Sequence, residues 1–300
     1  MVGMDQAAVD SLIVLLDLEP IEVNIFRGQS PDEERQRTFG GQVAGQALVA
    51  ATRTVEAGFG VHSLHGYFLR SGDVGVPILY EVARIRDARS FCTRRVQAIQ
   101  HGRPIFGLTA SFQRAEEGYE HQVPMPLGLP EPESLPDFRD RMAPYRHLLG
   151  SWYDRPRAID TRYCNWQPPD DRSPGTLIDD VWFRANGVLP DDPVLHQCVM
   201  AYASDITLLD TSLKPHGGSG LGDVFMASLD HAMWFHRPFR ADEWLLYHQD
   251  TPTAQGGRGL GRGLIFSSDG TLVASVMQEG VIRPARVPVL RPDADGRSQR

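Results

Sequence analysis

Alternation of apolar and polar residues over positions 224–235 predicts one long strand that is covered on both faces. One face would carry Met226, Ser228, Asp230, Ala232, Trp234 and His236, and the other Ala227, Leu229, His231, Met233 and Phe235. Both faces are mostly apolar, so a hydroxyl, a carboxylate and two imidazoles within this strand need partners. An unpaired buried polar group costs roughly 1–3 kcal/mol. The pattern therefore predicts that this strand forms a wall of a polar site.

The remaining pattern predicts two sets of elements in the same order, each a helix rich in small residues followed by strands. The first set has a helix over 42–55 and strands over 61–69, 78–86, 91–100 and 105–113. The second has a helix over 193–209, whose start at Asp191-Asp192-Pro193 is typical of a cap followed by proline, and strands over 224–235, 244–251, 259–267 and 272–282. Short turns between these strands predict antiparallel sheets, and hence an α+β fold.

Matching positions in the two sets indicate an internal duplication. The pairs are Tyr80 and Tyr247 at an offset of 167, Gly102 and Gly270 at 168, and Ser63 and Ser228 at 165. Residues 115–175 lie between the sets and hold ten of the 22 prolines. We therefore expect a first copy over 10–115, a proline-rich linker over 116–175 lying across the surface, a second copy over 176–290 and a tail over 291–300.

Composition and charge narrow the class of protein. The 300 residues are 41% apolar, and 30 basic against 38 acidic side chains give a net charge of −8 without any Lys/Arg-rich run. This balance argues against a nucleic-acid partner and against stable association with anionic membranes. Three scattered cysteines without metal-site spacing, and the lack of a long apolar segment or a leader pattern, predict a reduced, cytoplasmic protein without a metal.

Six sequence blocks resemble the acyl-CoA thioesterase II family. They are Phe39–Leu48 (FGGQVAGQAL), Ser63–Leu69 (SLHGYFL), Tyr202–Asp205 (YASD), Met226–Pro238 (MASLDHAMWFHRP), Glu243–Tyr247 (EWLLY) and Gln278–Arg283 (QEGVIR). The resemblance extends from about residue 12 to residue 283. It implies a double hot-dog fold, in which two tandem copies each wrap an antiparallel sheet around a helix. It also implies hydrolysis of fatty acyl-CoA to free fatty acid and CoA, without a cofactor, by a homo-oligomer that is a dimer or a tetramer.

The resemblance also implies three catalytic residues. In the family an Asp on the second helix takes a proton from water, while a strand hydroxyl and a Gln on the last strand hold that water. These positions are Asp205, Ser228 and Gln278 here. Thr is common at the hydroxyl position, and Ser keeps the donor and acceptor but loses the methyl group that restricts rotation.

Without the resemblance, these three residues leave alternatives open. Asp205 lies late in a helix, where the dipole disfavours a carboxylate, and it could simply bind a loop amide. A buried strand Ser such as Ser228 is usually satisfied by a neighbouring carbonyl group. Gln278 is more informative, because its amide would share a strand face with apolar residues and would need several partners.

The first copy is expected to lack this chemistry. An offset of 168 maps Gln278 to Ala110, and no carboxylate occurs between Gly40 and Thr54. We therefore predict one acid site per chain, with Ser63 in the place of Ser228 and the first copy forming at most one wall of the acyl tunnel.

Other polar or glycine-rich segments have less specific patterns. The segment Gly256–Gly263 is expected to be a strand onto which other backbone packs closely, although Arg258 and Arg262 within it could bind the phosphates of CoA. His236 could hold the ligand entrance, and His231, on the opposite face, is expected to be a structural partner. The segment Gly217–Gly222 is expected to be a loop near the mouth of the site.

Two other functions remain as alternatives. A hot-dog enoyl-CoA hydratase would need an acid-base Asp and His together on one short loop, and no such pair is evident. A non-enzymatic acyl-CoA-binding protein would not need the Asp, Ser and Gln set. Release of free thiol from an acyl-CoA would distinguish these alternatives from a thioesterase.

Overall fold

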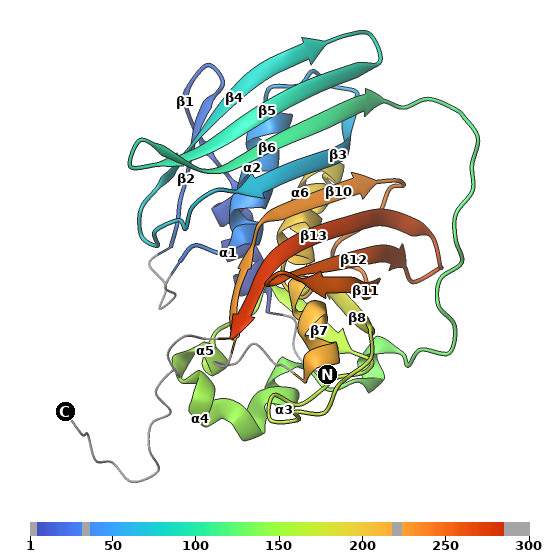
Figure 1. Ribbon diagram of the computed structural model, residues 1–300. Coiled ribbons are helices and arrows are strands. Elements are labelled where there is room, and N and C mark those ends of the chain that lie inside the picture. Colours follow the sequence, from blue (N-terminus) through green and yellow to red (C-terminus); the bar gives the residue numbers. More distant parts are fainter. Residues whose placement is uncertain (1–4, 32–36, 218–223, 285–300) are drawn as a thin grey trace, which may run out of the picture.

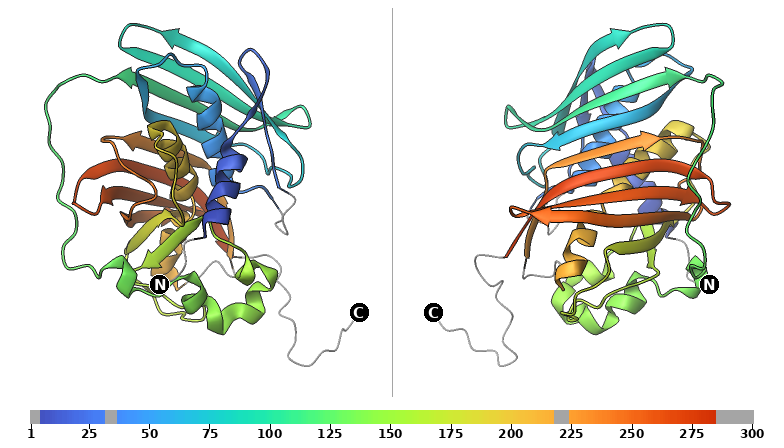
Figure 2. Two further views of the ribbon diagram at one scale, coloured as in Figure 1. Left: turned by 180° about the vertical axis from the view of Figure 1, so that it is seen from behind. Right: turned by 45° about the vertical axis from the view of Figure 1, so that its right-hand side comes forward.

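The computed structural model describes residues 5–31, 37–217 and 224–284, which form one curved sheet of 13 strands wrapped around two central helices. The sheet lies in front in Figure 1, and the view from behind in Figure 2 shows the helices on its other face. The arrangement agrees with the predicted α+β class. Within the described ranges, none of the helices combines the length and the apolar character needed to cross a membrane.

The first half contains two helices and six strands. They are α1 (Gln6–Leu16), β1 (Glu19–Glu22), β2 (Ile25–Gly28), α2 (Gly40–Thr52), β3 (Phe59–Phe68), β4 (Ile78–Asp87), β5 (Phe91–Gln100) and β6 (Arg103–Arg114). Their order in the sheet is β1-β2-β4-β5-β6-β3, with neighbouring strands antiparallel.

The second half repeats this arrangement in reverse. Its elements are β7 (Ile159–Tyr163), β8 (Ile178–Ala185), α6 (Pro193–Ser204), η3 (Leu209–His216), β9 (Val224–Ser228), β10 (Asp230–Phe235), β11 (Leu245–Gln255), β12 (Arg258–Ser267) and β13 (Leu272–Pro284). The order continues β10-β13-β12-β11-β8-β7, and β3 pairs with β10 at the centre. The two halves therefore share one sheet, related by a pseudo-twofold arrangement at the β3–β10 junction.

Strand registers support the duplication but correct one of its anchors. Tyr80 lies opposite Ala98 and Tyr247 opposite Ile265, so both members of the pair shift by 167 residues. Gly102 and Gly270 both adopt positive φ in the matching turns. The pairing of Ser63 with Ser228 is wrong: Ser228 lies opposite Gly280, and the residue 168 before Gly280 is Phe112, which lies opposite Val61. Both halves have an irregularity at this point, after Val61 in β3 and after Ser228 in β9, so Val61 is the counterpart of Ser228 and Ser63 that of Asp230.

The small residues of α2 allow close contact with a second helix as well as with the strands of the first half. Eleven of its 13 residues are buried, and α2 packs against α6. A Cβ atom on Gly41 would lie 2.3 Å from the carbonyl oxygen of Tyr202. Such an approach is possible only for glycine, so the two central helices touch through backbone atoms.

Several elements were missed by the pattern. The N-terminal α1, β1 and β2 precede the first predicted helix, and β7 and β8 precede the second. The expected linker holds short helical elements as well as β7: η1 (Pro132–Ser134), α3 (Phe138–Met142), η2 (Ala143–Tyr145), α4 (Arg146–Leu149) and α5 (Ser151–Asp154). Strand β7 has the polar sequence IDTRY, and its pairing with β8 rather than local alternation makes it a strand.

The predicted strand over 224–235 is in fact two strands separated by a bulge at Leu229. Ser228 lies opposite Gly280 and Ala232 opposite Met277, so four steps on one strand match three on β13. The carboxylate of Asp230 accepts the N–H of Glu279 at 2.7 Å, in place of a ladder carbonyl. The bulge changes the alternation, so Ser228 and His231, three residues apart, both face the helices.

Candidate active site

The three predicted catalytic residues meet at the C-terminal end of α6. Asp205 is the C-cap of α6, Ser228 is the last residue of β9, and Gln278 lies in β13. The side-chain nitrogen Nε2 of Gln278 donates to Oδ1 of Asp205 at 2.5 Å and to Oγ of Ser228 at 3.0 Å. The structure therefore brings together a carboxylate, an amide and a hydroxyl that are far apart in sequence.

The amide oxygen of Gln278 is the unusual atom in this group. Gln278 has no exposed surface, and its Oε1 finds no hydrogen-bond donor among the residues that the structure describes. Both N–H bonds of the amide are already used by Asp205 and Ser228. A buried acceptor without a donor destabilises the folded state, so its presence suggests a functional role. The Oε1 atom therefore suits a small donor such as an O–H group.

The Asp205 carboxyl group has a pKa closer to neutral pH than an ordinary Asp has. Burial raises its pKa to about 6, against the opposing effects of the Gln278 side chain, the Gly41 N–H, the Ser228 hydroxyl and the charge of Arg37. A carboxyl group with this pKa is mostly ionised at pH 7 and can still accept a proton readily.

The first half of the chain contributes directly to this carboxylate. The Gly41 N–H belongs to the first turn of α2, where the helix dipole favours negative charge. A Cβ atom on Gly40 would lie 2.7 Å from Oδ2 of Asp205 and 2.9 Å from the ring of Phe68. The FGGQ block thus brings the start of one helix against the end of the other without side chains between them.

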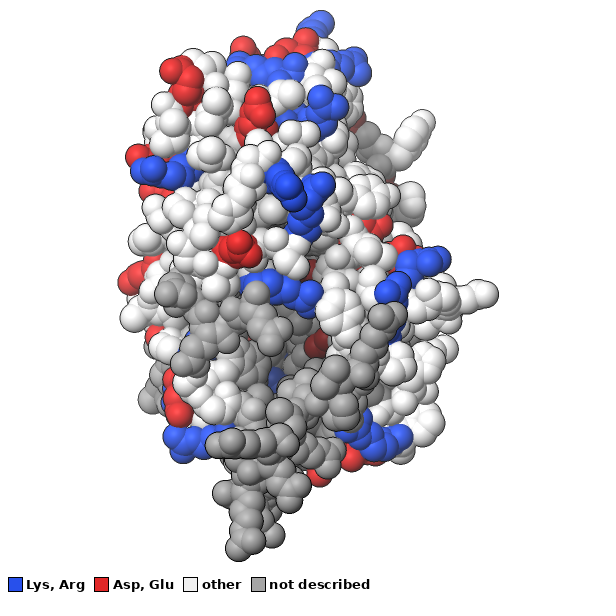
Figure 3. Space-filling view, turned by 60° about the vertical axis from the view of Figure 1, so that its left-hand side comes forward, with Lys and Arg blue, Asp and Glu red and all other residues white. Residues whose placement is uncertain are grey.

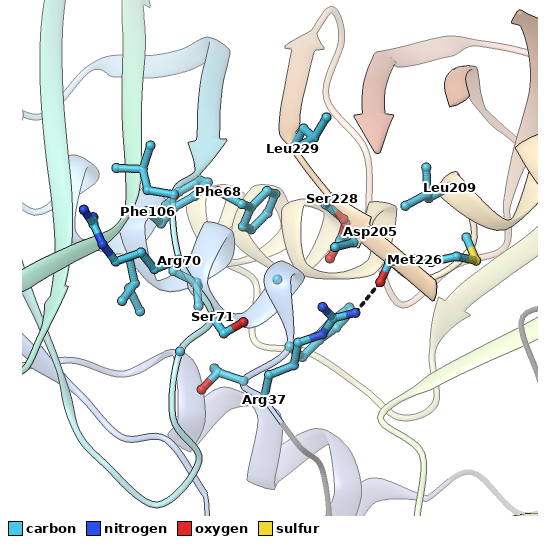
Figure 4. Close-up of a pocket in the computed structure, with 18 of the residues that line it drawn as sticks. Arg37, Phe68, Arg70, Ser71, Phe106, Asp205, Leu209, Met226, Ser228 and Leu229 are labelled. Atoms are coloured by element: carbon cyan, nitrogen blue, oxygen red, sulfur yellow. Dashed lines mark hydrogen bonds between the residues drawn. The ribbon is translucent and has the colours of Figure 1, made fainter. Parts of the chain in front are cut away.

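A cavity of about 630 Å³ opens beside Asp205, between the two halves of the chain. Phe68 and Phe106 form an apolar wall from the first half, with ring centroids 4.8 Å apart. The facing wall in Figure 4 comes from the second half and consists of Leu209, Met226, Ser228 and Leu229. This size and lining suit an apolar chain that ends at a polar group.

Two arginines border the cavity. The guanidinium group of Arg37 donates to the carbonyl oxygen of Met226, so that it joins the two walls in Figure 4. Arg70 lies farther along the first-half wall and donates to the carbonyl oxygen of Pro104 at 2.6 Å. Sequence reasoning missed both residues, because each is an isolated arginine. The one available signal was position, since Arg37 precedes the FGGQ block and Arg70 follows the SLHGYFL block.

The structure does not bring the predicted substrate-binding residues to this cavity. Arg258 pairs with Glu279 and Arg262 pairs with both oxygens of Asp250, on the face of β12 that points away from the helices. His236 is exposed and hydrogen-bonds Ser275 at 2.8 Å, again on the outer face.

The glycines of β12 have the packing role that the pattern favoured. A Cβ atom on Gly261 would lie 2.8 Å from the carbonyl oxygen of Leu208. The chain that connects α6 to η3 therefore packs directly on this strand. In the Gly217–Gly222 segment, Gly217 ends η3 with positive φ, and residues 218–222 lie outside the described residues.

The face of the molecule in Figure 3 carries both signs of charge. Figure 3 shows Lys and Arg side chains interspersed with Asp and Glu on one face, which is hollowed near its middle. In the described parts of the chain, no three His, Cys, Asp or Glu side chains are grouped as metal ligands would be.

Fold and site together define a hot-dog protein with an acid, amide and hydroxyl group beside an apolar cavity. The family described as "Acyl-CoA thioesterase N-terminal domain" matches residues 30–113, and the family described as "Acyl-CoA thioesterase" matches residues 156–281. The chain is 42% identical to acyl-coenzyme A thioesterase 8 of Homo sapiens over 281 residues, which cover 90% of this chain and 88% of that protein. It is 40% identical to acyl-CoA thioesterase 2 of Haemophilus influenzae, with coverage of 91% and 97%.

Solved structures agree with this assignment. The acyl-CoA thioesterase II TesB2 of Mycobacterium marinum is 48% identical, with a TM-score of 0.77 and coverage of 92% of this chain and 99% of that one. A protein with a hot-dog fold from Alicyclobacillus acidocaldarius shares the fold at 19% identity, with a TM-score of 0.74 and coverage of 92% and 98%. The chain therefore belongs to the acyl-CoA thioesterase family, and the predicted double hot-dog fold is confirmed.

Proposed function

We propose that this protein hydrolyses fatty acyl-CoA to free fatty acid and CoA, with water as the nucleophile and Asp205 as the general base. The observation that carries the proposal is that Asp205 and Ser228 line an apolar cavity and that Gln278, buried behind them, hydrogen-bonds both, in a chain of this family. The apolar walls suit an acyl chain, and the polar cluster suits its thioester end.

In the proposed reaction, each group has one task. The Asp205 carboxylate accepts a proton from water, while Oε1 of Gln278 accepts the other water proton and Ser228 fixes the oxygen lone pairs. The water oxygen then bonds to the thioester carbon, the carbon–sulfur bond breaks, and the CoA sulfur leaves with the electron pair and takes up the proton that Asp205 accepted, which restores the carboxylate. Acid-base help of this kind contributes on the order of 10²–10⁴ in rate.

Water attacks directly in this proposal, without an acyl-enzyme. A serine nucleophile is usually activated by a histidine, whereas the groups that contact the Ser228 hydroxyl are the Gln278 amide and the Asp205 carboxylate. Mass spectrometry during turnover is expected to find no acyl group on Ser228 or Asp205.

The developing oxyanion needs a donor, and the Gly40 N–H is the group that we assign to it. Gly40 lines the cavity at the first turn of α2, where N–H groups have no acceptor within the helix. Its position next to the Asp205 carboxylate would place the carbonyl oxygen and the attacking water on neighbouring points of one wall.

The CoA phosphates need cations near the cavity, and Arg37 and Arg70 supply them. We assign phosphate binding to these two arginines in preference to Arg258 and Arg262, which pair with carboxylates on the far face of the sheet. Exchange of Arg70 for Met is expected to raise KM for acyl-CoA several-fold with a smaller effect on kcat.

We also propose a homo-oligomer, a dimer or a tetramer. The extended segment between β6 and η1 runs outside the sheet in Figures 1 and 2, and Tyr119, Val123 and Leu127 on it are exposed, each residue with a relative accessibility of 51% or more. Apolar side chains on such a segment suit burial against a second copy. Light scattering that finds only monomers at micromolar concentration would contradict this proposal. The predicted cytoplasmic location stays a prediction.

Release of free thiol from purified protein and a series of fatty acyl-CoA substrates tests the proposed function. The wild type should release thiol, and Asp205→Asn should lower kcat at least about 10²-fold because it keeps the shape and removes the base. The variant must be folded for this comparison, which circular dichroism checks. Wild-type turnover in folded Asp205→Asn would refute the mechanism.

The same preparation distinguishes the alternative functions. A hydratase would consume the double bond of an enoyl-CoA without releasing thiol, and a binding protein would do neither. A hydratase would also need a histidine at the cavity, whereas His231 is completely buried against Ser204. We therefore expect thiol release and no hydration.

A further inference from the structure

His231 contacts Ser204, the residue that directly precedes Asp205. It is in β10, has no exposed surface, and its Nε2 lies 2.8 Å from Oγ of Ser204. Ser204 is the last residue of α6, and Asp205 follows it as the C-cap. The bulge at Leu229 thus turns two residues of one strand segment toward adjacent positions at the end of α6, because Ser228 contacts Asp205 and His231 contacts Ser204.

The hydrogen bonds of the Ser204 hydroxyl group indicate which ring nitrogen of His231 carries the proton. The Ser204 hydroxyl lies 3.1 Å from the carbonyl oxygen of Ala201, to which it can only donate. Its single hydrogen is then used, so His231 Nε2–H must be the donor to Ser204 Oγ. The opposite tautomer would bury an unpaired N–H at Nδ1, which costs more than an unpaired lone pair does.

The histidine is costly in this place, and the fold does not require it. Its Nδ1 has no partner among the described residues, and burial lowers its pKa to about 4, which keeps the ring neutral. Strand pairing also identifies the residue that corresponds to His231 in the first half. Ala232 lies opposite Met277, and His65 lies opposite Thr109, which is 168 residues before Met277. His65 therefore corresponds to Ala232, and the preceding Leu64 corresponds to His231. Leu64 is equally buried. The same position therefore accepts an apolar side chain in the half that lacks an acid.

Two hydrogen bonds to Ser204 hold the C-terminal end of α6. His231 holds the Ser204 side chain, and the Tyr247 hydroxyl donates to the Ser204 carbonyl oxygen at 3.3 Å. The last turn of a helix frays unless its groups find such partners. We propose that His231 is a positioning residue, which holds the last turn of α6 through Ser204 so that the Asp205 carboxylate stays in hydrogen-bond reach of Gln278. The proposal rests on the proposed function of Asp205.

His231→Leu, which copies the first half, tests this role. We expect a folded protein whose kcat falls about tenfold with little change in KM, because a small misplacement of a catalytic group has effects of this size. The acid limb of the kcat profile should move to higher pH. Looser hydrogen bonds from Gln278, Ser228 and Gly41 stabilise the ionised carboxylate less, which raises its pKa. Arg37, Asp210 and Tyr247, the charged and titratable groups around Asp205, are unchanged in this variant.

Two further variants separate positioning from general stability. His231→Gln places an N–H donor near the position of Nε2 and should restore most of kcat and the original acid limb. His196→Leu is the matched control, because His196 is also buried on α6 but contacts the Ala241 N–H near the start of that helix. It should lower Tm and leave kcat and the acid limb unchanged.

If His231→Leu does not fold, Ser204→Ala tests the same contact from the helix. Ser204→Ala alone should reproduce the loss in kcat, and adding His231→Leu should cause little further loss if both variants fold. Wild-type kcat and acid limb in folded His231→Leu or Ser204→Ala would overturn the proposal, as would equal losses in His231→Leu and His231→Gln. The Asp205→Asn result keeps the two proposals apart: an inactive Asp205→Asn beside an unaffected His231→Leu removes only the positioning role.

Discussion

At the scale of single residues, the site depends on one amide that organises two other groups. Gln278 donates both of its N–H bonds, to Asp205 and to Ser228, and keeps an unpaired oxygen on the same amide. This arrangement leaves the carboxylate mostly ionised near neutral pH while it remains surrounded by protein. Asp205 needs such support, because the C-terminal end of a helix disfavours negative charge.

The pH dependence of kcat should report Asp205. Its pKa of about 6 lies above the ordinary value for Asp, and the ionised form is the base in the proposed mechanism. The rate should therefore be constant above about pH 7 and should fall tenfold per pH unit well below pH 6. Initial rates of thiol release between pH 4.5 and 8.5, with enzyme stability checked at each pH, measure this limb. An acid limb centred near pH 4 would show that Asp205 is not buried as described.

Ser228→Ala and Gln278→Ala should each lower kcat, and their effects should not multiply. In the proposed mechanism both residues act on one water, so the first substitution already disorders the target of the second. Ser228→Thr, which keeps the hydroxyl, is the matched control and should retain most of the activity. The kinetics of the double variant decide the point, because a loss equal to the product of the single losses would contradict a shared water.

At the scale of elements, the bulge at Leu229 and the first turn of α2 orient the groups of the site. The bulge at Leu229 turns Ser228 and His231 toward the same side, which strict alternation over 224–235 excluded. The glycines at the start of α2 let its N–H groups approach Asp205 from the other half. Neither feature adds a reactive group, yet each decides whether the reactive groups meet.

Gly40→Ala tests the contact between the two helices. The new Cβ would lie 2.7 Å from Oδ2 of Asp205, so the carboxylate or α2 must shift. We expect a folded variant with kcat lowered at least tenfold, because φ is ordinary at this position and alanine favours a helix. Gly107→Ala is the control, since its Cβ would meet no atom within 4 Å. Equal activity in the two variants would show that the helix start is not part of the site.

At the scale of the whole molecule, the duplication has produced one site from two halves. The second half contributes Asp205, Ser228 and Gln278, whereas the first half has Val61, Leu64 and Ala110 in the places of Ser228, His231 and Gln278. The first half nevertheless supplies an amide to the carboxylate and one wall of the cavity. The halves are therefore unequal in chemistry and mutually dependent in structure.

Binding stoichiometry should show this inequality. Calorimetric titration with a non-hydrolysable acyl-CoA analogue is expected to give one productive site per chain, and Ala110→Gln should not create a second, because the first half still lacks an acid.

A fragment over 175–290 should aggregate, since it would expose the α6 surface that α2 covers and the edge of β10 that pairs with β3. A soluble, fully active fragment would contradict the single cooperative unit.

Much of this architecture followed from sequence pattern. Alternation located most strands of the shared sheet, small residues located α2, and turn glycines at a constant offset located the duplication. The family resemblance named Asp205, Ser228 and Gln278. These signals are local or repeated, so a single chain displays them. The glycine strand β12 was also interpreted correctly, because a run of glycines leaves few uses other than close packing.

Tertiary structure alone decided how the parts meet. Edge strands such as β7 are strands because a neighbour pairs with them, and their own sequences alternate too little to reveal it. The Asp230 carboxylate accepts a backbone N–H of β13 beside the bulge, and only the strand pairing shows that Ser228 and His231 share a face. Arg258 and Arg262 have the chemistry for phosphates but face away, whereas Arg37 and Arg70 have no motif and border the cavity. Residue type therefore indicated which chemistry was possible, and the packing of two helices and one sheet determined which residues lie within reach of the site.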